Sequence, residues 1–168
     1  MKNVAIRIAT SFLVAGVFMD TAHAGFGSWS ADVEADPFSG GNNVTVSYMS
    51  SLRSGAAILC DSATKELTVR VIPGFVYDIR MVGFDPEMKF AIDSKKLEID
   101  AVGKTGSVGD NLAIAETVLT GDDAKAFVHA FASAKKQVAV KDGISTKPFI
   151  GTATGSTAAG KALLDCLK

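Results

Sequence analysis

Histidine is scarce in this chain, and cysteine, proline and tryptophan are nearly as rare. The 168 residues include two histidines, two cysteines, four prolines and one tryptophan. Zinc and iron sites built from several histidines, and zinc sites built from four cysteines, are therefore excluded by count. No apolar run reaches the roughly 20 residues that a membrane-spanning helix needs. The sequence thus predicts no metal, no other cofactor and no membrane span in the processed chain.

The first 24 residues have the pattern of a cleavable secretory signal peptide. Two cations, Lys2 and Arg7, precede an apolar run over residues 8–19, which is typical of a signal peptide and too short to span hydrocarbon. Ala22 and Ala24 then supply the small residues that a signal peptidase requires. We expect cleavage after Ala24 and a periplasmic or secreted mature protein. The alternative, a buried N-terminal helix of a cytosolic protein, leaves this order of segments unexplained.

Removing those 24 of the 168 residues leaves 144, the size of one domain with a hydrophobic core. Cleavage also removes two of the 17 basic residues and one of the 18 acidic residues, so the mature net charge is −2. This balance provides no general attraction to nucleic acid or to an anionic membrane surface. A protein or another envelope component is the expected partner, and nucleic acid is not.

Apolar residues alternate with period two through the first half of the mature chain, which indicates β-strands. Clusters of turn-forming residues separate these segments. The expected strands cover residues 29–33, 44–48, 56–60, 66–72, 77–84, 89–92 and 96–101. This half is predicted to form an antiparallel meander.

The apolar period changes to helical spacing in the second half. A helix is expected over 122–134, followed by strands over 137–141 and 147–154 and a last helix over 156–167 that Ser156 caps. Runs of strands followed by mixed helix and strand, without a regular βαβ rhythm, favour an α+β fold. We therefore predict a single domain, 25–168, with a mainly antiparallel sheet, meander or sandwich-like, and two helices in its C-terminal half.

The two cysteines fall on expected core positions. Cys166 shares a helical stripe with Ala159 and Leu163, and Cys60 shares a strand face with Ile58. Two such cysteines in an exported domain favour a disulfide. The alternative is a catalytic redox pair, but redox enzymes usually hold their cysteines close together as Cys-x-x-Cys.

Common catalytic constellations are missing from the mature sequence. His129, its single histidine, falls on the solvent side of the expected helix, and no Gly-x-Ser-x-Gly segment supplies a serine nucleophile. A pair of carboxylates remains open as a catalytic device. Asp78, Asp85 and Glu98 are examples of scattered acids, and no spacing selects one pair.

Two glycine-rich segments resemble phosphate-binding loops only in part. The segment from Gly155 to Ala162 has the required glycines and lysine, but Ala162 stands where a hydroxyl would hold magnesium. We interpret Gly155 as a turn residue at a helix entry. The second segment, Gly103 to Gly109, has Glu98 in place of the first glycine and is predicted to be a flexible surface loop.

The segment Pro73 to Tyr77 places two aromatic residues beside turn-forming residues. Phe75 and Tyr77 are therefore the candidate partner-binding residues, since turns on both sides can hold aromatic side chains outward. Packing of these rings in the core is the alternative.

Several features together resemble the invasion-associated locus B type of small periplasmic proteins. They are the export signal, the Gly-Ser-Trp29 opening, and a closing order of helix, strand, Asp-Gly turn, strand and a helix with Gly155-Ser-x-x-Ala159. The resemblance covers Trp29 and roughly the last 45 residues. It implies an envelope or secreted accessory protein of all-β or α+β build, with no catalytic residue to carry over. The extra cysteine pairs of that family are missing here.

Two functional hypotheses follow. The first is a non-enzymatic periplasmic or secreted accessory or binding protein of the bacterial envelope. The second is an envelope-polymer hydrolase, or a hydrolase inhibitor, that uses scattered carboxylates. A cleft with two acids about 5 to 10 Å apart would favour the enzyme, and exposed aromatic residues on a flat sheet face would favour binding.

Overall fold

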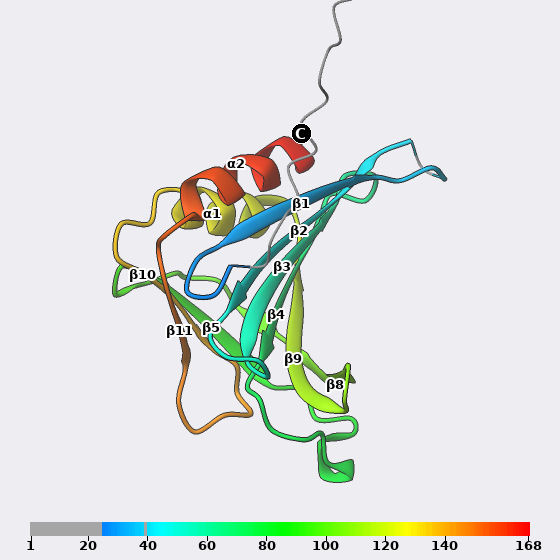
Figure 1. Cartoon of the computed structure of the whole chain (residues 1–168), viewed down its shortest axis with the longest axis vertical. Coiled ribbons are helices and arrows are strands. Elements are labelled where there is room, and N and C mark those ends of the chain that lie inside the picture. The colour runs from blue at the N-terminus through cyan, green and yellow to red at the C-terminus, as the bar shows by residue number, and fades with distance from the viewer. Residues whose placement is uncertain (1–24, 39) are drawn as a thin grey trace, which may run out of the picture.

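A computed structural model describes residues 25–38 and 40–168. The expected signal peptide, including the cleavage residues Ala22 and Ala24, lies outside the described residues. Two antiparallel sheets and two helices form the fold (Figure 1).

The larger sheet has six strands in the order β1-β2-β3-β4-β9-β8. The first four follow one another along the chain, which confirms the expected meander for these strands, and β9 then pairs with β4. The meander does not continue to the strand expected over 89–92, which lies in the second sheet. The strands of this sheet are β1 (Ser30–Ala35), β2 (Asn42–Met49), β3 (Gly55–Asp61), β4 (Glu66–Ile72), β8 (Lys104–Val108) and β9 (Leu112–Leu119).

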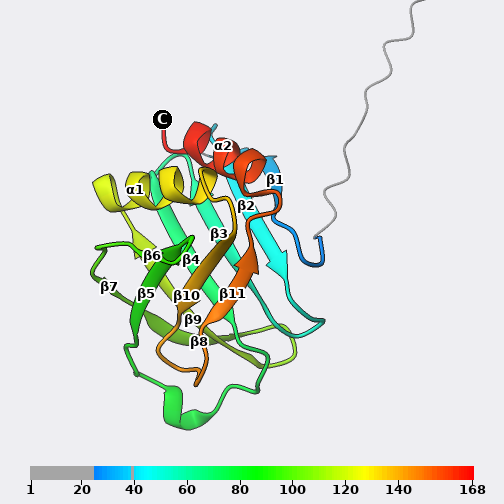
Figure 2. The ribbon, with the colours of Figure 1, turned by 90° about the vertical axis from the view of Figure 1, so that its left-hand side faces the viewer.

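The smaller sheet has the order β11-β10-β5-β6, and β7 pairs with β5 beside this path. Its strands are β5 (Glu87–Ile92), β6 (Lys95–Lys96), β7 (Ala101–Val102), β10 (Gln137–Lys141) and β11 (Phe149–Thr152). Figures 1 and 2 show this sheet facing one side of the larger sheet. Two helices, α1 (Gly121–Ala132) and α2 (Ser156–Cys166), cover one end of the two-layered structure. The fold is therefore α+β and mainly antiparallel.

The alternation of apolar residues places one face of each strand in the shared core. On β2, β3 and β4 the buried residues alternate with more exposed ones along each strand. Phe127 and Phe131 of α1 and Phe90 of β5 are at most 1% exposed and fill the space beneath the helices. Burying an aromatic or large aliphatic side chain contributes about 1.5–3 kcal/mol, so this core holds the two sheets and the helices together.

An aromatic cluster joins the edges of the two sheets. The ring centroid of Trp29 lies 4.9 Å from that of Phe131, 5.1 Å from that of Tyr48 and 6.2 Å from that of Phe149. The indole Nε1 donates to the Thr152 carbonyl at 2.8 Å, and the Thr152 amide donates to the Tyr48 hydroxyl at 3.2 Å. The indole N–H of Trp29 and the hydroxyl of Tyr48 thus both have hydrogen-bond partners on Thr152. These bonds fix β11 next to β2.

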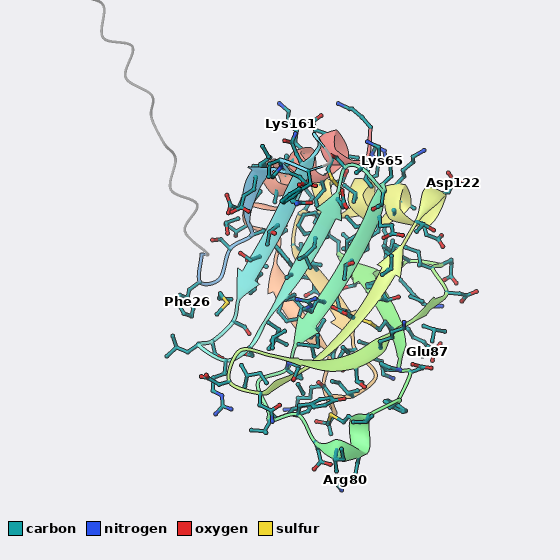
Figure 3. The ribbon with its side chains drawn as sticks, turned by 90° about the vertical axis from the view of Figure 1, so that its right-hand side faces the viewer. Phe26, Lys65, Arg80, Glu87, Asp122 and Lys161 are labelled. Atoms are coloured by element: carbon teal, nitrogen blue, oxygen red, sulfur yellow. A yellow bond between two sulfur atoms is a disulfide. The ribbon has the colours of Figure 1, made fainter. Side chains whose placement is uncertain are left out.

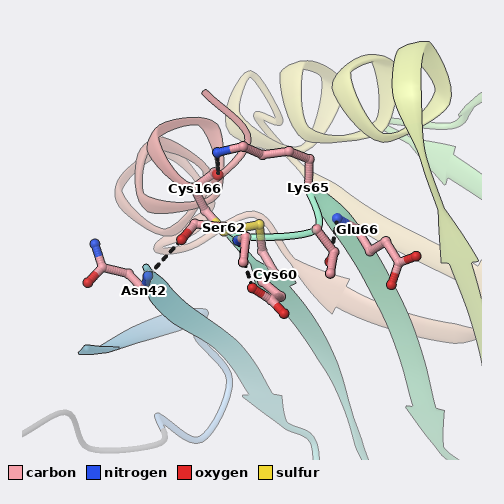
Figure 4. The surroundings of a disulfide bond; sticks show 9 residues. Asn42, Cys60, Ser62, Lys65, Glu66 and Cys166 are labelled. Carbon is pink, nitrogen blue, oxygen red and sulfur yellow. Dashed lines mark hydrogen bonds between the residues drawn. A yellow bond between two sulfur atoms is a disulfide. The ribbon is translucent and has the colours of Figure 1, made fainter. Parts of the chain in front are cut away.

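The expected disulfide is present between Cys60 of β3 and Cys166 at the end of α2 (Figure 4). Both residues are buried, with exposed fractions of 3% and 4%. Beside the bridge, Lys65 Nζ donates to the Cys166 carbonyl at 3.3 Å. The expected stripe on the last helix is confirmed, because Ala159, Leu163 and Cys166 are buried. The bridge ties α2 to the larger sheet across 106 residues of sequence.

One expected strand is wrong. Residues 77–84 hold a short 3₁₀ helix, η1 (Ile79–Met81), in place of a strand. The Asp78 carboxylate accepts the Arg80 backbone N–H at 2.9 Å, and Gly83 has a φ of +74°. These two features favour a turn and end the extended conformation.

The segment Gly103 to Gly109 contains β8 (Lys104–Val108) and is not the flexible loop that we expected. The Gly103 amide donates to the Pro86 carbonyl at 2.8 Å, and a Cβ at Gly103 would lie 2.8 Å from the Glu116 carbonyl oxygen. Gly103 therefore permits a close approach to β9. The expected strand over 96–101 is also wrong in extent, because it is split into the two-residue strands β6 and β7.

Ser156 does not cap α2. The cap residue is Gly155, with a φ of +85°, and Ser156 is the first helical residue. The Ser156 side chain is fully buried, and its Oγ has no hydrogen-bond partner. A Cβ at position 155 would lie 2.1 Å from the Trp29 carbonyl oxygen. This close approach requires glycine and fixes where the helix begins.

Candidate functional site

A cleft of about 480 Å³ opens at the end of the two sheets that lies away from the helices. One wall comes from the end of β4 and the segment that follows it, and the other from the connection between β10 and β11. The β2–β3 turn closes one side. The cleft lies next to the aromatic cluster, because Phe149 belongs to both.

Apolar side chains form most of the cleft wall. They include Val71, Ile72, Phe75, Ile144, Phe149 and Ile150. Phe75 is 36% exposed and Ile150 is 55% exposed, so part of this surface is open to solvent. Clefts of this size with mostly apolar walls are typical of small-molecule binding sites.

The polar side chains of the cleft are hydroxyl groups and two charged groups. They come from Ser50, Ser54, Asp142, Ser145, Thr146 and Lys147. Ser50 and Ser54 are linked to one another by a hydrogen bond of 2.8 Å between their hydroxyl oxygens. Lys147 is exposed and is the one cation among the residues that line the cleft.

Asp142 is the buried acid of the cleft, with 1% of its surface exposed. Its Oδ1 accepts the backbone N–H groups of Ile144 at 3.0 Å and Ser145 at 2.8 Å, and its Oδ2 accepts the Ser145 hydroxyl at 2.6 Å. Both carboxylate oxygens are therefore occupied in holding the β10–β11 connection in place. A Cβ at the adjacent Gly143 would lie 2.6 Å from Pro86 Cβ, and its φ of +74° also requires glycine.

The two candidate aromatic residues lie in different places. Phe75 lines the cleft, and its carbonyl accepts the Ala113 amide at 2.8 Å beside the start of β9. Tyr77 is half-buried, is not part of the cleft wall, and donates its amide to the Asn111 carbonyl at 2.8 Å. Backbone hydrogen bonds thus fix this segment, and one of its two candidate residues lines the cleft.

The scattered acids considered for catalysis lie outside the cleft wall. Asp78 forms an ion pair with Arg80, 2.9 Å between Oδ1 and Nε, and this side-chain hydrogen bond lowers the pKa of Asp78 to about 2. Glu98 pairs with Lys96 at 3.2 Å on the surface, and Asp85 is exposed in the loop before β5. Figure 3 shows the loop that carries Arg80 at the far end of the molecule from the helices.

His129 is exposed on α1, as the helical spacing predicted. The Gly155 to Ala162 segment has two glycines. Gly155 lets the backbone approach Trp29 closely. Gly160 permits the contact between α1 and α2, because a Cβ at position 160 would lie 2.5 Å from Ala132 Cβ. Packing thus accounts for both glycines. Within residues 25–38 and 40–168, no group of three His, Cys, Asp or Glu side chains is placed to hold a metal ion.

The wall formed by residues 144–150 was not anticipated as a binding surface. Its sequence, Ile-Ser-Thr-Lys-Pro-Phe-Ile, combines apolar residues with hydroxyl groups and a lysine directly after the Asp-Gly turn. This composition is the one sequence feature that could have indicated a binding surface. The position of residues 144–150 beside Phe75 depends on how the two sheets pack, which local sequence patterns do not reveal.

No family model, curated protein or solved structure matches this chain. The resemblance to the invasion-associated locus B proteins therefore stays a prediction. Over the part of the chain that the structure describes, no helix is long and apolar enough to cross a lipid bilayer.

Proposed function

We propose that this protein is an exported, non-enzymatic binding protein of the bacterial envelope. Its ligand places an apolar group in the cleft between Phe75 and the β10–β11 connection. The observation that carries this proposal is the cleft of about 480 Å³ with its mostly apolar wall. The cleft falls in the range of about 300–1,000 Å³ that small-molecule sites occupy.

The cleft favours binding over carboxylate hydrolysis. A glycosidase of the usual kind needs two carboxyl groups about 5 to 10 Å apart across the scissile bond. The cleft wall has one carboxylate, Asp142, and its oxygens already accept three hydrogen bonds from the β10–β11 connection. We therefore do not assign the hydrolase alternative to this cleft.

The chemistry of the wall favours a ligand with an apolar body and an anionic end. Phe75, Ile144 and Ile150 offer apolar contact area, and Lys147 offers a positive charge. The hydroxyl groups of Ser50 and Ser54, which also line the cleft, can donate a hydrogen bond to the same anionic end. An aliphatic or aromatic carboxylate or sulfonate has this combination of properties.

Export is supported by the signal-peptide pattern and by the disulfide. Disulfides persist in the periplasm and outside the cell, whereas the cytosol keeps thiols reduced. The bridge between Cys60 and Cys166 is buried beneath α2. An accessory or binding protein of the envelope is also what the invasion-associated locus B resemblance implies.

The proposal is tested with the fluorescent probe 8-anilinonaphthalene-1-sulfonate, an aromatic sulfonate, and with decanoate as its competitor. We expect one saturable site on the mature protein from which decanoate displaces the probe. Phe75→Ala is expected to weaken binding by about tenfold or more, as for a central aromatic contact. Tyr77→Ala is expected to leave it unchanged.

Phe38→Ala is the matched control, because Phe38 is 98% exposed in the turn between β1 and β2 and lies outside the cleft wall. Thermal unfolding of each variant shows whether the fold is intact. Equal affinity of the wild type and a folded Phe75→Ala variant would contradict the cleft as the binding site. Unfolding of Phe75→Ala would instead assign the ring to the core.

A further inference from the structure

Strand β1 is an open edge of the larger sheet. It pairs with β2 on one side, and no strand among the described residues pairs with its other side. Figures 1 and 3 show β1 at this margin of the sheet. Residues 32–35 are exposed. The strand has six residues, with no proline and no irregularity in its register. Natural sheets usually shorten, cover or distort such edges.

The register shows which peptide groups of β1 are unpaired. Asp36 continues the register by one step, and its N–H donates to the Gly41 carbonyl at 2.9 Å. Hydrogen-bonded pairs alternate along an antiparallel ladder. Glu34 and Asp32 therefore direct their peptide groups toward β2, whereas Val33 and Ala35 direct theirs outward.

Trp29 confirms this alternation. Trp29 is four residues before Val33, so its peptide group points the same way in an extended chain. Its N–H points away from β2 and donates to the Thr154 carbonyl at 2.8 Å. On the outward side of the chain, the Trp29 peptide group is thus paired, and the peptide groups of Val33 and Ala35 have no backbone hydrogen bond among the described residues. None of these β1 residues lines the cleft.

The side chains of β1 determine which side chains would favour pairing of another strand with it. Asp32 and Glu34 lie on the outer face of the sheet, and neither takes part in an ion pair of the described residues. Val33 lies on the opposite face and is 54% exposed. A strand beside β1 would therefore gain from cations facing the two acids and an apolar residue facing Val33.

A second copy of this chain does not meet that requirement. Two β1 strands paired antiparallel about Val33 would place Asp32 of each copy opposite Glu34 of the other. Like charges directly opposite one another destabilise a pair of strands. The same acids that oppose self-pairing attract a basic strand.

We propose that the free edge of β1 binds, by strand addition, an extended polypeptide segment with lysine or arginine at alternate positions and apolar residues between them. The main-chain groups of Val33 and Ala35 provide the hydrogen bonds, and Asp32 and Glu34 select the charge. Strand addition of this kind takes affinity from the main chain and specificity from alternate side chains.

The probe for this site is a fluorescein-labelled peptide of alternating lysine and valine. In the register above, the valine peptide groups pair with β1, so a lysine–proline peptide keeps the charge and spacing but loses these hydrogen bonds. We expect saturable binding of the first peptide, measured by fluorescence anisotropy, and binding of the second that is about tenfold weaker or more. A glutamate–valine peptide is expected not to bind.

The matched protein variant is Val33→Pro. The Val33 N–H points outward, so proline removes an edge donor without breaking the ladder to β2. We expect this variant to melt like the wild type and to bind the lysine–valine peptide about tenfold more weakly or worse. The double variant Asp32→Asn, Glu34→Gln is expected to weaken binding and to reduce its salt dependence. Phe75→Ala is expected to bind this peptide normally, which separates the edge from the cleft.

Equal binding of the lysine–valine and lysine–proline peptides would overturn the proposal, because charge alone would then account for the binding. No saturable binding up to about 1 mM peptide, a limit that corresponds to about 4 kcal/mol, would also overturn it. A dimer of the wild type that Val33→Pro dissociates would assign the edge to a second copy instead. The two-peptide comparison uses wild-type protein, so the outcome is decided even if Val33→Pro does not fold.

Discussion

Removal of the Cys60–Cys166 bridge is expected to lower the stability of the protein substantially. The bridge closes a loop across 106 residues, for which the chain-entropy model gives a stabilisation of about 4 to 5 kcal/mol. For a domain of this size, 1 kcal/mol corresponds to about 2–4 °C in the melting temperature. We therefore expect Tm to fall by roughly 10–20 °C when the bridge is lost.

The measurement is thermal unfolding of the mature protein by circular dichroism, with and without a reducing agent. Cys60→Ala, Cys166→Ala and the double variant are the controls. Because either substitution removes the bridge, each single variant is expected to lose nearly as much stability as the double variant. Thiol titration of oxidised protein under denaturing, non-reducing conditions is expected to find no free thiol.

Two outcomes would refute this reasoning. A reduced protein that melts within about 3 °C of the oxidised one, less than the equivalent of 2 kcal/mol, would show that the bridge contributes little. Two free thiols in correctly exported material would show that the bridge does not form in the cell, and would make the redox interpretation the better one.

Three further predictions concern single side chains. Asp93 accepts three backbone N–H groups, from Gln137, Lys135 and Lys136, and these hydrogen bonds lower its pKa. Asp93→Asn should therefore lower Tm at neutral pH. The difference should shrink as the pH falls below about 4, where the carboxyl group of the unfolded chain becomes protonated, and should vanish below the lowered pKa of the folded state. Gly160→Ala should destabilise by about 1–3 kcal/mol in chemical unfolding through its contact with Ala132, although alanine ordinarily stabilises a helix relative to glycine. His129→Ala should change stability by less than about 0.5 kcal/mol and leave probe binding intact, because the side chain is exposed.

Local patterns in the sequence predicted most of the elements. The alternation in β2, β3 and β4 and the helical spacing of α1 and α2 each reflect burial of one face, and that burial is what the structure shows. The disulfide followed from the same reasoning, because both cysteines lay on faces expected to be buried.

The hairpin of β8 and β9 was missed. The glycines in and beside the first strand suggested a loop. The signal for the second strand is the alternation of the buried residues Ala113, Ala115, Thr117 and Leu119. β9 pairs with β4, which lies far earlier in the chain. Such pairings depend on tertiary packing more than on local propensity.

Sequence patterns pointed to one residue of the cleft wall but did not predict the cleft. Phe75 was expected at a turn with its ring accessible, and it lies there, whereas Tyr77 lies outside the cleft wall. Residues 144–150 reach Phe75 because the two sheets face one another, and nothing in their spacing indicates which sheet they will meet. That Phe75 and Tyr77 bind a partner therefore stays a prediction, and of the two only Phe75 lines the cleft.

Two-dimensional NMR of the isotopically labelled mature protein, titrated with decanoate, tests the binding proposal most directly. We expect saturable amide shifts that concentrate at residues 50–54, 71–75 and 142–150, with little change on β1 or on the exposed face of α1 around His129. Shifts spread evenly over the surface, or confined to the helices, would contradict the assignment of the cleft as the binding site.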